Sequence, residues 1–495
     1  MKRFHPTLAL VVAALLLMTA ACGQKSGVAL SAGAGNGAAS TGAAGDSGLG
    51  DASATGDTVP AADAGTGATP GAPGTPTAGT GTKTAVTTKP GATAGGTGGA
   101  TGTGTGGTSG GGAAAAKADR TGIDDATKTI TIGIHAPVTG AAPIDQKTFD
   151  TGKDIYWKFV KDNGGIIGGY NVKVVFRDDQ FSPTVARQKC QEMVENDKVF
   201  MLIGAAGADQ ITSCARYAES INVPYLSAGV NTDGLAGLKN YFAVSMTYAQ
   251  QAPLLAGLIK NKLAKTRVGL AVLDTPDFVD ARKAAIAAVQ ASGGQIVSDQ
   301  KIPKTAGTNE TNATATNLKN DGADVVYVLT SPTIFINLVK SIHAQVNYDP
   351  DMVGPGITNG LNLVAQVACP DAAKAQFLSP FPQLDVIKDL DPDYQVSYNK
   401  YVGQNGDDIG LALWGINKVL RQMFEAGATD GKELSRQSFL AGIASGKEFK
   451  TNVFPPLKYS ASNHFGSTQA HLLAAECTPP NGPRFRTAAQ FASAF

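Results

Sequence analysis

The hydrophobic pattern of the chain becomes regular only after residue 118, where short apolar runs alternate with segments that carry apolar residues at helical spacing. The apolar runs at 129–140, 170–180 and 199–204 are predicted strands, and a fourth follows at 223–229. The first three strands are each followed by a segment with helical spacing. The pattern therefore predicts a mostly parallel sheet that is covered by helices on both faces.

The same alternation starts again after residue 247. Residues 266–274, 323–330 and 350–356 are predicted strands of this second set, with helices between them. The restart predicts a second domain of the same βα kind. Later segments return to helical spacing, and the apolar stripe of one such helix is formed by Leu411, Ile416, Val419, Leu420 and Met423.

The first residues have the order of a secretory signal. Lys2 and Arg3 precede an apolar run that is too short to span a bilayer comfortably, and small residues then precede Cys22. The stretch MTAAC resembles a bacterial lipobox, although Thr19 stands where the pattern prefers leucine. We expect a signal peptide at residues 1–21 and a lipid anchor on Cys22. The alternative is an ordinary signal peptide with an incidental cysteine.

Residues 22–117 are dominated by Gly, Ala, Thr, Ser and Pro. Such a segment cannot bury enough apolar surface to offset the loss of chain entropy on ordering, so we expect a disordered, lipid-anchored tether. The stretch GTGTGG within it superficially fits a dinucleotide-binding fingerprint. It follows no predicted strand and opens no predicted helix, so that interpretation is discarded.

The net charge of the whole chain is +1, with 41 basic and 40 acidic residues, and no basic cluster stands out. This balance argues against nucleic acid as a partner. No HExxH, Walker A, GxSxG or paired-histidine motif occurs in residues 118–495, and AGIASGKE and AGATDGKE are each one residue short of a phosphate-binding loop. We therefore expect a binding protein and not an enzyme, and no cofactor or metal.

Four cysteines follow Cys22, and an even number in an exported domain favours disulfides over metal binding or redox chemistry. Ser182 and Pro183 have the residue types of a helix N-cap and first position, and the predicted helix carries Cys190 on its inner side. Cys214 lies on the inner side of the next helix, so these two are expected to face each other. Four cysteines allow three pairings. The four are Cys190, Cys214, Cys369 and Cys477.

From about residue 129 to its end, the chain resembles the type I periplasmic solute-binding proteins, and in particular the Leu/Ile/Val-binding group that serves ABC importers. The resemblance is carried by IGIHAPVTG, NGGIIGGYNVKVVFRDDQFSPTVA, FMLIGAAGA, YAESINVPYLSAG and NDGADVVYV, in that order. It implies an α/β fold of two lobes, each a mostly parallel sheet flanked by helices, with three crossovers at a hinge and the ligand enclosed between the lobes.

The resemblance also implies how the chain is divided between the lobes. Disulfides within each lobe, Cys190 with Cys214 and Cys369 with Cys477, would leave the hinge free to close. The implied segments are 118–247 for lobe 1, 248–379 for lobe 2, 380–455 for the return to lobe 1, and 456–495 for the last crossover and the lobe 2 tail.

Two strand-to-helix turns, at 204–208 and 227–229, contain small residues that would let a ligand approach the backbone. In open α/β sheets the ligand lies outside the carboxyl ends of the strands, where a helix N-terminus offers free N–H groups to an anion. Tight packing of the turns is the alternative explanation. The expected ligand-binding residues are Asp145, Gly207, Ala208, Asp209, Gly229, Asn231, Phe278, Ser331 and Gly356.

Several of these positions depart from the amino-acid-binding members of the family. Those members carry a serine where this chain has Ala208, a threonine at Asn231, and an acidic residue at Gly356 that meets the ligand's ammonium group. A buried ammonium without a counter-charge is costly, so amino-acid specificity does not carry over directly. Asp145 or Asp209 could replace the acidic residue, although Asp209 fits a helix N-cap equally well.

The sequence thus predicts an exported, lipid-anchored solute-binding protein on the outer face of the cytoplasmic membrane, at the cell surface or in the periplasm. We expect a monomer that captures a small polar ligand, an amino acid or a related carboxylate or amide, and delivers it to an ABC permease. The alternative is a ligand-sensing lipoprotein of the same fold that acts in signalling. No signalling element is visible in the sequence, which favours transport.

Overall fold

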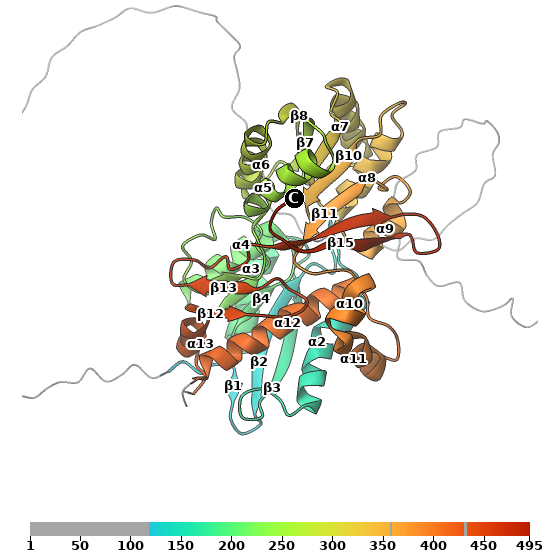
Figure 1. Ribbon diagram of the computed structural model, residues 1–495. Coiled ribbons are helices and arrows are strands. Elements are labelled where there is room, and N and C mark those ends of the chain that lie inside the picture. Colours follow the sequence, from blue (N-terminus) through green and yellow to red (C-terminus); the bar gives the residue numbers. More distant parts are fainter. Residues whose placement is uncertain (1–117, 357–358, 430–432) are drawn as a thin grey trace, which may run out of the picture. The chain divides into compact units, whose positions relative to one another are not determined.

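The computed structural model describes residues 118–356, 359–429 and 433–495 (Figure 1). The signal peptide, the Cys22 anchor and the tether that the sequence predicts lie outside the described residues. Across these three described ranges, none of the helices combines the length and the apolar character needed to cross a membrane.

Lobe 1 is built on a six-stranded sheet with the order β1-β2-β4-β5-β6, in which β3 also pairs with β2. Every pair is parallel except β1 with β2, in agreement with the mostly parallel sheet that the sequence predicts. The short strands β4 to β6 are buried at every position, because helices cover both faces. The bounds are β1 (Ile123–Asp124), β2 (Thr129–Ala136), β3 (Asn171–Asp178), β4 (Leu202–Gly204), β5 (Tyr225–Ser227) and β6 (Tyr241–Ala243).

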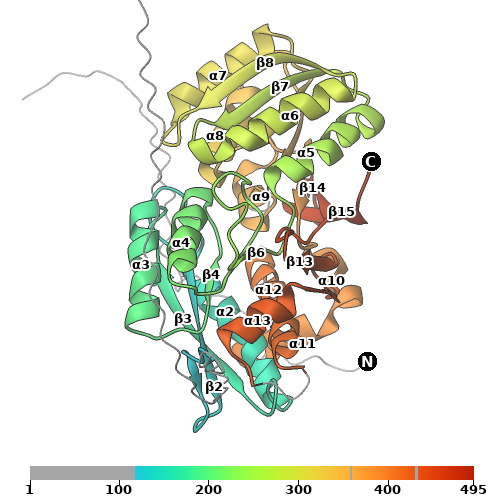
Figure 2. The same ribbon diagram turned by 90° about the vertical axis from the view of Figure 1, so that its left-hand side faces the viewer.

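Two pairs of helices cover the lobe 1 sheet. Helix α2 (Gln146–Asp162) packs against α12 (Asp408–Gly427), and α3 (Pro183–Glu195) packs against α4 (Ala208–Ser220). Figure 2 shows α3 and α4 on one side of the strands and α2 and α12 on the other. The returning segment also contributes α10 (Leu384–Leu390), α11 (Pro392–Val402), α13 (Arg436–Ile443) and the hairpin of β12 (Ser445–Phe449) with β13 (Leu457–Ser460).

Local sequence signals explain the ends and faces of these helices. Ser182 caps α3 by accepting a hydrogen bond from the Val185 N–H, and Pro183 is the first helical residue, so the predicted helix start is confirmed. The predicted apolar stripe of α12 is confirmed as well, since all five of its side chains are buried in the lobe 1 core.

Lobe 2 is built on a seven-stranded sheet with the order β15-β14-β11-β10-β9-β7-β8. Strands β7 to β11 pair in parallel, whereas β14 and β15 from the tail add antiparallel at one edge. The strands are β7 (Arg267–Leu273), β8 (Gln295–Ile302), β9 (Val325–Leu329), β10 (Asp351–Pro355), β11 (Ala375–Ser379), β14 (Ala470–Glu476) and β15 (Arg484–Ala492). The helices are α5 (Tyr248–Gly257), α6 (Val279–Ala291), α7 (Thr308–Asn320), α8 (Pro332–His343) and α9 (Asn362–Ala368).

The chain passes between the two sheets three times. It leaves lobe 1 after β6, returns after β11, and crosses again between β13 and β14. The fold is therefore the two-lobed α/β arrangement with three crossovers that the resemblance implies. The crossovers place segments that are far apart in sequence, such as α2 and α12, side by side (Figure 1).

The structure contains two disulfides, and each lies within one lobe. Cys190 on α3 is bonded to Cys214 on α4, with a Cα–Cα distance of 6.0 Å. Cys369 at the end of α9 is bonded to Cys477 after β14, with a Cα–Cα distance of 5.4 Å. The second disulfide ties the tail to lobe 2 across a sequence separation of 108 residues, whereas the first spans only 24.

We predict that the long-range disulfide contributes more to stability. A cross-link reduces the entropy of the unfolded chain more when it closes a longer loop, so replacing Cys369 and Cys477 by alanine should lower the free energy of unfolding by about 4–5 kcal/mol. Replacing Cys190 and Cys214 by alanine should lower it by about 3–4 kcal/mol. Urea unfolding of both double variants measures the difference, and equal losses would contradict the loop-length argument.

Candidate ligand-binding cleft

An apolar cavity of about 110 Å³, here called the outer cavity, lies between the two lobes. Lobe 1 contributes the loop after β2, Phe181, and the turn between β4 and α4. Lobe 2 contributes the end of β7, Phe278, the turn between β9 and α8, and the start of α9. Because both lobes line this cavity, a ligand within it would touch both.

Four of the nine expected ligand-binding residues line the outer cavity. Gly207 and Ala208 reach it from the start of α4, and Phe278 and Ser331 reach it from lobe 2. Phe278 is held by an edge-to-face contact with Tyr248, with ring centroids 5.6 Å apart, and Tyr248 also lines the cavity. The structure therefore brings together residues from both lobes that are up to 124 positions apart in the sequence, from Gly207 to Ser331.

The lobe 1 wall is the N-terminus of α4. Gly207 is its N-cap with φ of 85°, and no side chain caps this helix end. A Cβ atom here would lie 2.1 Å from Gln210 Oε1, so both the backbone conformation and the space favour glycine. The first N–H groups of a helix have no partner within the helix and carry partial positive charge. This wall consequently suits an anionic group of a ligand.

The lobe 2 wall is the turn from β9 into α8. Ser331 is the N-cap of α8, and its hydroxyl makes no capping hydrogen bond. Thr330 is only 6% exposed, and its Oγ1 has no hydrogen-bond partner among the residues that the structure describes. A buried hydroxyl without a partner is costly, so an acceptor on a ligand would stabilise it. The sequence analysis did not select Thr330, because an isolated threonine at a strand end carries no distinctive signal.

A second cavity of about 70 Å³, here called the inner cavity, lies next to the outer one. The two share four lining residues, namely Ile144, Ala206, Leu361 and Ile409. None of the described residues that line either cavity carries a formal charge. An ammonium group enclosed here would therefore lack a counter-charge, which is energetically unfavourable.

Asp209 and Asn231 take part in a polar cluster that joins the lobes beside the cleft. Asp209 on α4 pairs with Lys304 of lobe 2, with 2.6 Å between Oδ2 and Nζ. Asn231 donates from Nδ2 to Asp277 Oδ1 of lobe 2 at 3.0 Å, and Thr212 donates to the same oxygen at 3.2 Å. Both predicted residues thus contact the opposite lobe and are absent from the cavity lining.

Asp209 and Asp277 share this cluster, and their pKa values move apart. Burial, followed by the hydrogen bond and the negative charge of Asp209, raises the pKa of Asp277 to about 7. Burial opposes ionisation of Asp209 too, but its hydrogen bonds with Asp277 and Lys304 lower its pKa overall. Below about pH 7, the pair therefore holds a proton on Asp277.

The remaining expected residues have local structural tasks. Asp145 is the N-cap of α2 and accepts a hydrogen bond from the Thr148 N–H at 2.7 Å. Gly229 is tightly packed, because a Cβ atom there would lie 2.3 Å from the Ser245 carbonyl oxygen. Gly356 follows β10, where a Cβ atom would contact the Phe377 ring at 3.3 Å. None of the three lines the outer cavity, and their ligand contacts stay predictions.

Gly204 also has a packing explanation. A Cβ atom at this position would lie 2.1 Å from the Tyr225 hydroxyl. That hydroxyl is 2.6 Å from Nε2 of His135, whose Nδ1 is 2.8 Å from Asp179 Oδ2, and all three side chains are buried. Gly204 therefore makes room for a buried polar chain in lobe 1, next to the Cys190–Cys214 disulfide.

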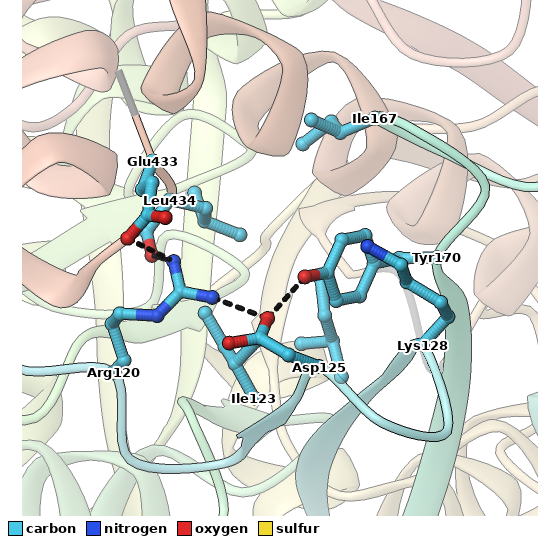
Figure 3. Close-up of a pocket in the computed structure, with 9 residues that line it drawn as sticks. Arg120, Ile123, Asp125, Lys128, Ile167, Tyr170, Glu433 and Leu434 are labelled. Carbon is cyan, nitrogen blue, oxygen red and sulfur yellow. Dashed lines mark hydrogen bonds and ion pairs between the residues drawn. The ribbon is translucent and has the colours of Figure 1, made fainter.

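A third cavity, of about 390 Å³, lies in lobe 1 near β1 (Figure 3). Its charged side chains pair with one another: Arg120 contacts both Asp125 and Glu433, and the Tyr170 hydroxyl donates to Asp125. Lys128 lies over the Tyr170 ring, 4.5 Å from its centroid. None of the expected ligand-binding residues lines this cavity, and lobe 2 contributes nothing to it. We therefore place the candidate site in the cleft.

Comparison with known proteins identifies the family. Residues 129–479 match the model of the periplasmic binding protein family, so the chain belongs to that family. The resemblance to type I solute-binding proteins is thereby confirmed, and the chain is a binding protein and not an enzyme. No curated protein sequence matches the chain significantly.

Solved structures with the same fold carry different ligands. A fatty acid ABC transporter substrate-binding protein from Thermomonospora curvata has a TM-score of 0.64 and 16% identity, over 76% of this chain and 95% of that one. A valine-bound branched-chain amino acid ABC transporter protein from Thermus thermophilus has a TM-score of 0.63 and 15% identity, over 73% of this chain and 96% of that one. A solute-binding protein from Rhodopseudomonas palustris BisB5 in complex with 3,4-dihydroxybenzoic acid has a TM-score of 0.62 and 17% identity, over 74% of this chain and 98% of that one. Identities this low establish the fold alone.

The raised pKa of Asp277 generates a pH prediction. The ordinary pKa is 3.8 and the folded-state pKa is about 7, so the folded protein binds more protons than the unfolded chain between these values. The contribution of this group to stability is complete below about pH 4, declines as the pH rises, and is lost above about pH 7. The variant Asp277→Asn keeps an oxygen that can accept the hydrogen bonds from Asn231 and Thr212. Because its side chain does not titrate, it should lack the loss of stability with rising pH that Asp277 causes.

Urea unfolding midpoints at pH 5 and pH 8 measure the effect. The wild type should lose more stability than Asp277→Asn between these two pH values. Asp274→Asn, which changes an exposed carboxylate three residues away, should behave like the wild type. An equal pH dependence in Asp277→Asn and the wild type would show that Asp277 does not hold the proton.

Proposed function

We propose that this protein is the extracytoplasmic solute-binding component of an ABC importer, held on the outer face of the cytoplasmic membrane by a lipid on Cys22. It captures a small carboxylate with an apolar body between its two lobes and delivers it to the permease. The observation that carries the proposal is the uncharged cavity between the lobes, bounded on one side by the N-terminus of α4, which no side chain caps, and on the other by Thr330 and Ser331.

The cleft supports a carboxylate as the anionic group. The N–H groups at the start of α4 and the two hydroxyls of lobe 2 are all hydrogen-bond donors, and the cavity offers no acidic side chain to oppose a negative charge. A zwitterionic amino acid would also place its ammonium group in this uncharged space, where no described side chain compensates it. Ligands named for the structural neighbours include a fatty acid, 3,4-dihydroxybenzoic acid and valine, and the first two lack an ammonium group.

Closure of the two lobes would couple capture to delivery. A ligand held by α4 on one side and by Thr330 and Ser331 on the other favours the closed arrangement over the open one, because only the closed arrangement makes both sets of contacts. The ion pair of Asp209 with Lys304 and the hydrogen bonds to Asp277 join the lobes beside the cavity. The permease would then recognise the closed form.

A ligand screen tests the proposed function. We expect benzoate and short aliphatic carboxylates to raise the melting temperature of the full-length protein in detergent, and valine and leucine to leave it unchanged. A ligand at a hundred times its dissociation constant should stabilise the folded state by about 2.7 kcal/mol. The proposal would be refuted if no carboxylate shifts the melting temperature; a shift with amino acids alone would reject the ligand class.

Thr330→Val is the matching variant, because valine keeps the shape of threonine and removes the unpartnered hydroxyl. It should weaken carboxylate binding by about 1.5–3 kcal/mol, the contribution of a hydrogen bond to a charged group. Thr316→Val, which makes the same change on an exposed face of α7, should bind like the wild type. Isothermal titration measures both, and unchanged binding in Thr330→Val would remove that hydroxyl from the site.

The lipid anchor has its own test. Cys22→Ser removes the only sulfur in the first 117 residues apart from the two methionines, so it should abolish incorporation of a labelled fatty acid and release the protein from the membrane fraction. Ser26→Ala should remain labelled and membrane-bound. Persistent labelling of Cys22→Ser would show that the anchor lies elsewhere.

A further inference from the structure

The inner cavity continues the cleft into the body of lobe 1. It lies at the carboxyl ends of β4, β5 and β6, where Ala205, Ala228 and Val244 follow the strands, and it is closed on the other side by α12. All of its fourteen lining residues are apolar. Four of them are alanines: Ala205 and Ala206 follow β4, Ala228 follows β5, and Ala412 lies on α12. A leucine at any of these positions would fill space that the alanines leave open.

The partition between the two cavities is made of flexible aliphatic side chains. Ile144, Leu361 and Ile409 line both cavities, together with Ala206. Changes of rotamer in isoleucine and leucine would connect the cavities without moving the backbone. A flexible chain could follow such a passage, whereas a rigid ring would have to fit beside the partition in the outer cavity.

We propose that the ligand is a monocarboxylate with an extended acyl chain, whose carboxylate lies in the outer cavity at α4, Thr330 and Ser331 and whose chain enters the inner cavity under α12. This inference rests on the proposed function and specifies its ligand class. Charge is confined to one end of such a ligand, and the walls follow the same division: the polar groups lie at the outer cavity, and the inner cavity is wholly apolar. Empty apolar cavities destabilise a folded protein, so filling the inner cavity favours the bound form.

The experiment compares ligands that differ only in chain length, using the full-length protein and isothermal titration. Decanoate should bind the wild type at least about tenfold more tightly than butanoate, because additional methylene groups leave water. Methyl decanoate, which has the chain but no carboxylate, should bind at least about tenfold more weakly than decanoate. Tight binding of methyl decanoate would show that the chain alone is recognised, as in an esterified lipid, and would overturn the assignment to a free carboxylate.

Ala412→Phe places a ring in the inner cavity and is the decisive variant. It should weaken decanoate binding at least about tenfold and leave butanoate and benzoate within about twofold of the wild type. Ala287→Phe makes the same substitution at an exposed position on α6 and should leave the binding of all three ligands unchanged. Should Ala412→Phe fail to fold, Ala228→Leu fills the same cavity from the opposite wall and should give the same selective loss.

The outcomes separate the two proposals. The acyl chain does not enter the inner cavity if decanoate binds no more tightly than butanoate and benzoate, or if Ala412→Phe weakens the binding of all three ligands equally. In either case the proposed function stands. If none of the carboxylates binds the wild type, the proposed function itself fails.

Discussion

Parallel pairing of the strands in both lobes determines where everything else in the cleft lies. In lobe 1 the carboxyl ends of β2, β4 and β5 lie at one edge of the sheet. In lobe 2 the carboxyl ends of β7, β9 and β10 likewise lie at one edge. The helices that follow these strands begin at the same edge, so the N-termini of α4 and α8 both line the outer cavity. The three crossovers then bring the two edges together across one cavity, with a helix N-terminus on each side of it.

The cleft separates charge from apolar space. Asp209, Lys304 and Asp277 satisfy one another across the lobes, next to Phe181, whose ring centroid is 4.5 Å from Lys304 Nζ. The cavity beyond them is lined without a formal charge. This division has a physical reason, because an unpaired charge inside the cavity would hold water and oppose an apolar ligand. The lobes are joined by polar contacts, while the cavity between them is lined by uncharged residues.

Small residues near the cleft serve two different purposes. Gly204 and Gly229 are required because neighbouring groups, the Tyr225 hydroxyl and the Ser245 carbonyl, occupy the space of a side chain. Ala205, Ala228 and Ala412 instead border a cavity that they leave empty. Both kinds look alike in a sequence, since a small residue at a turn can mean either close packing or open space.

The sequence by itself determined the βα alternation, the parallel sheets, the start of α3, the buried stripe of α12 and the membership of a binding-protein family, because these depend on local periodicity, capping residues and motif order. It also predicted Gly207 and Ala208, which line the cavity, since turns after parallel strands lie at a known edge. Phe278 and Ser331, which line it too, were predicted through the family resemblance. Only the tertiary structure decided that Asp209 and Asn231 face the other lobe, that Thr330 has an unpartnered hydroxyl, and that α12 closes an inner cavity. Each of these depends on which distant segments the crossovers bring into contact, and no local pattern encodes such contacts.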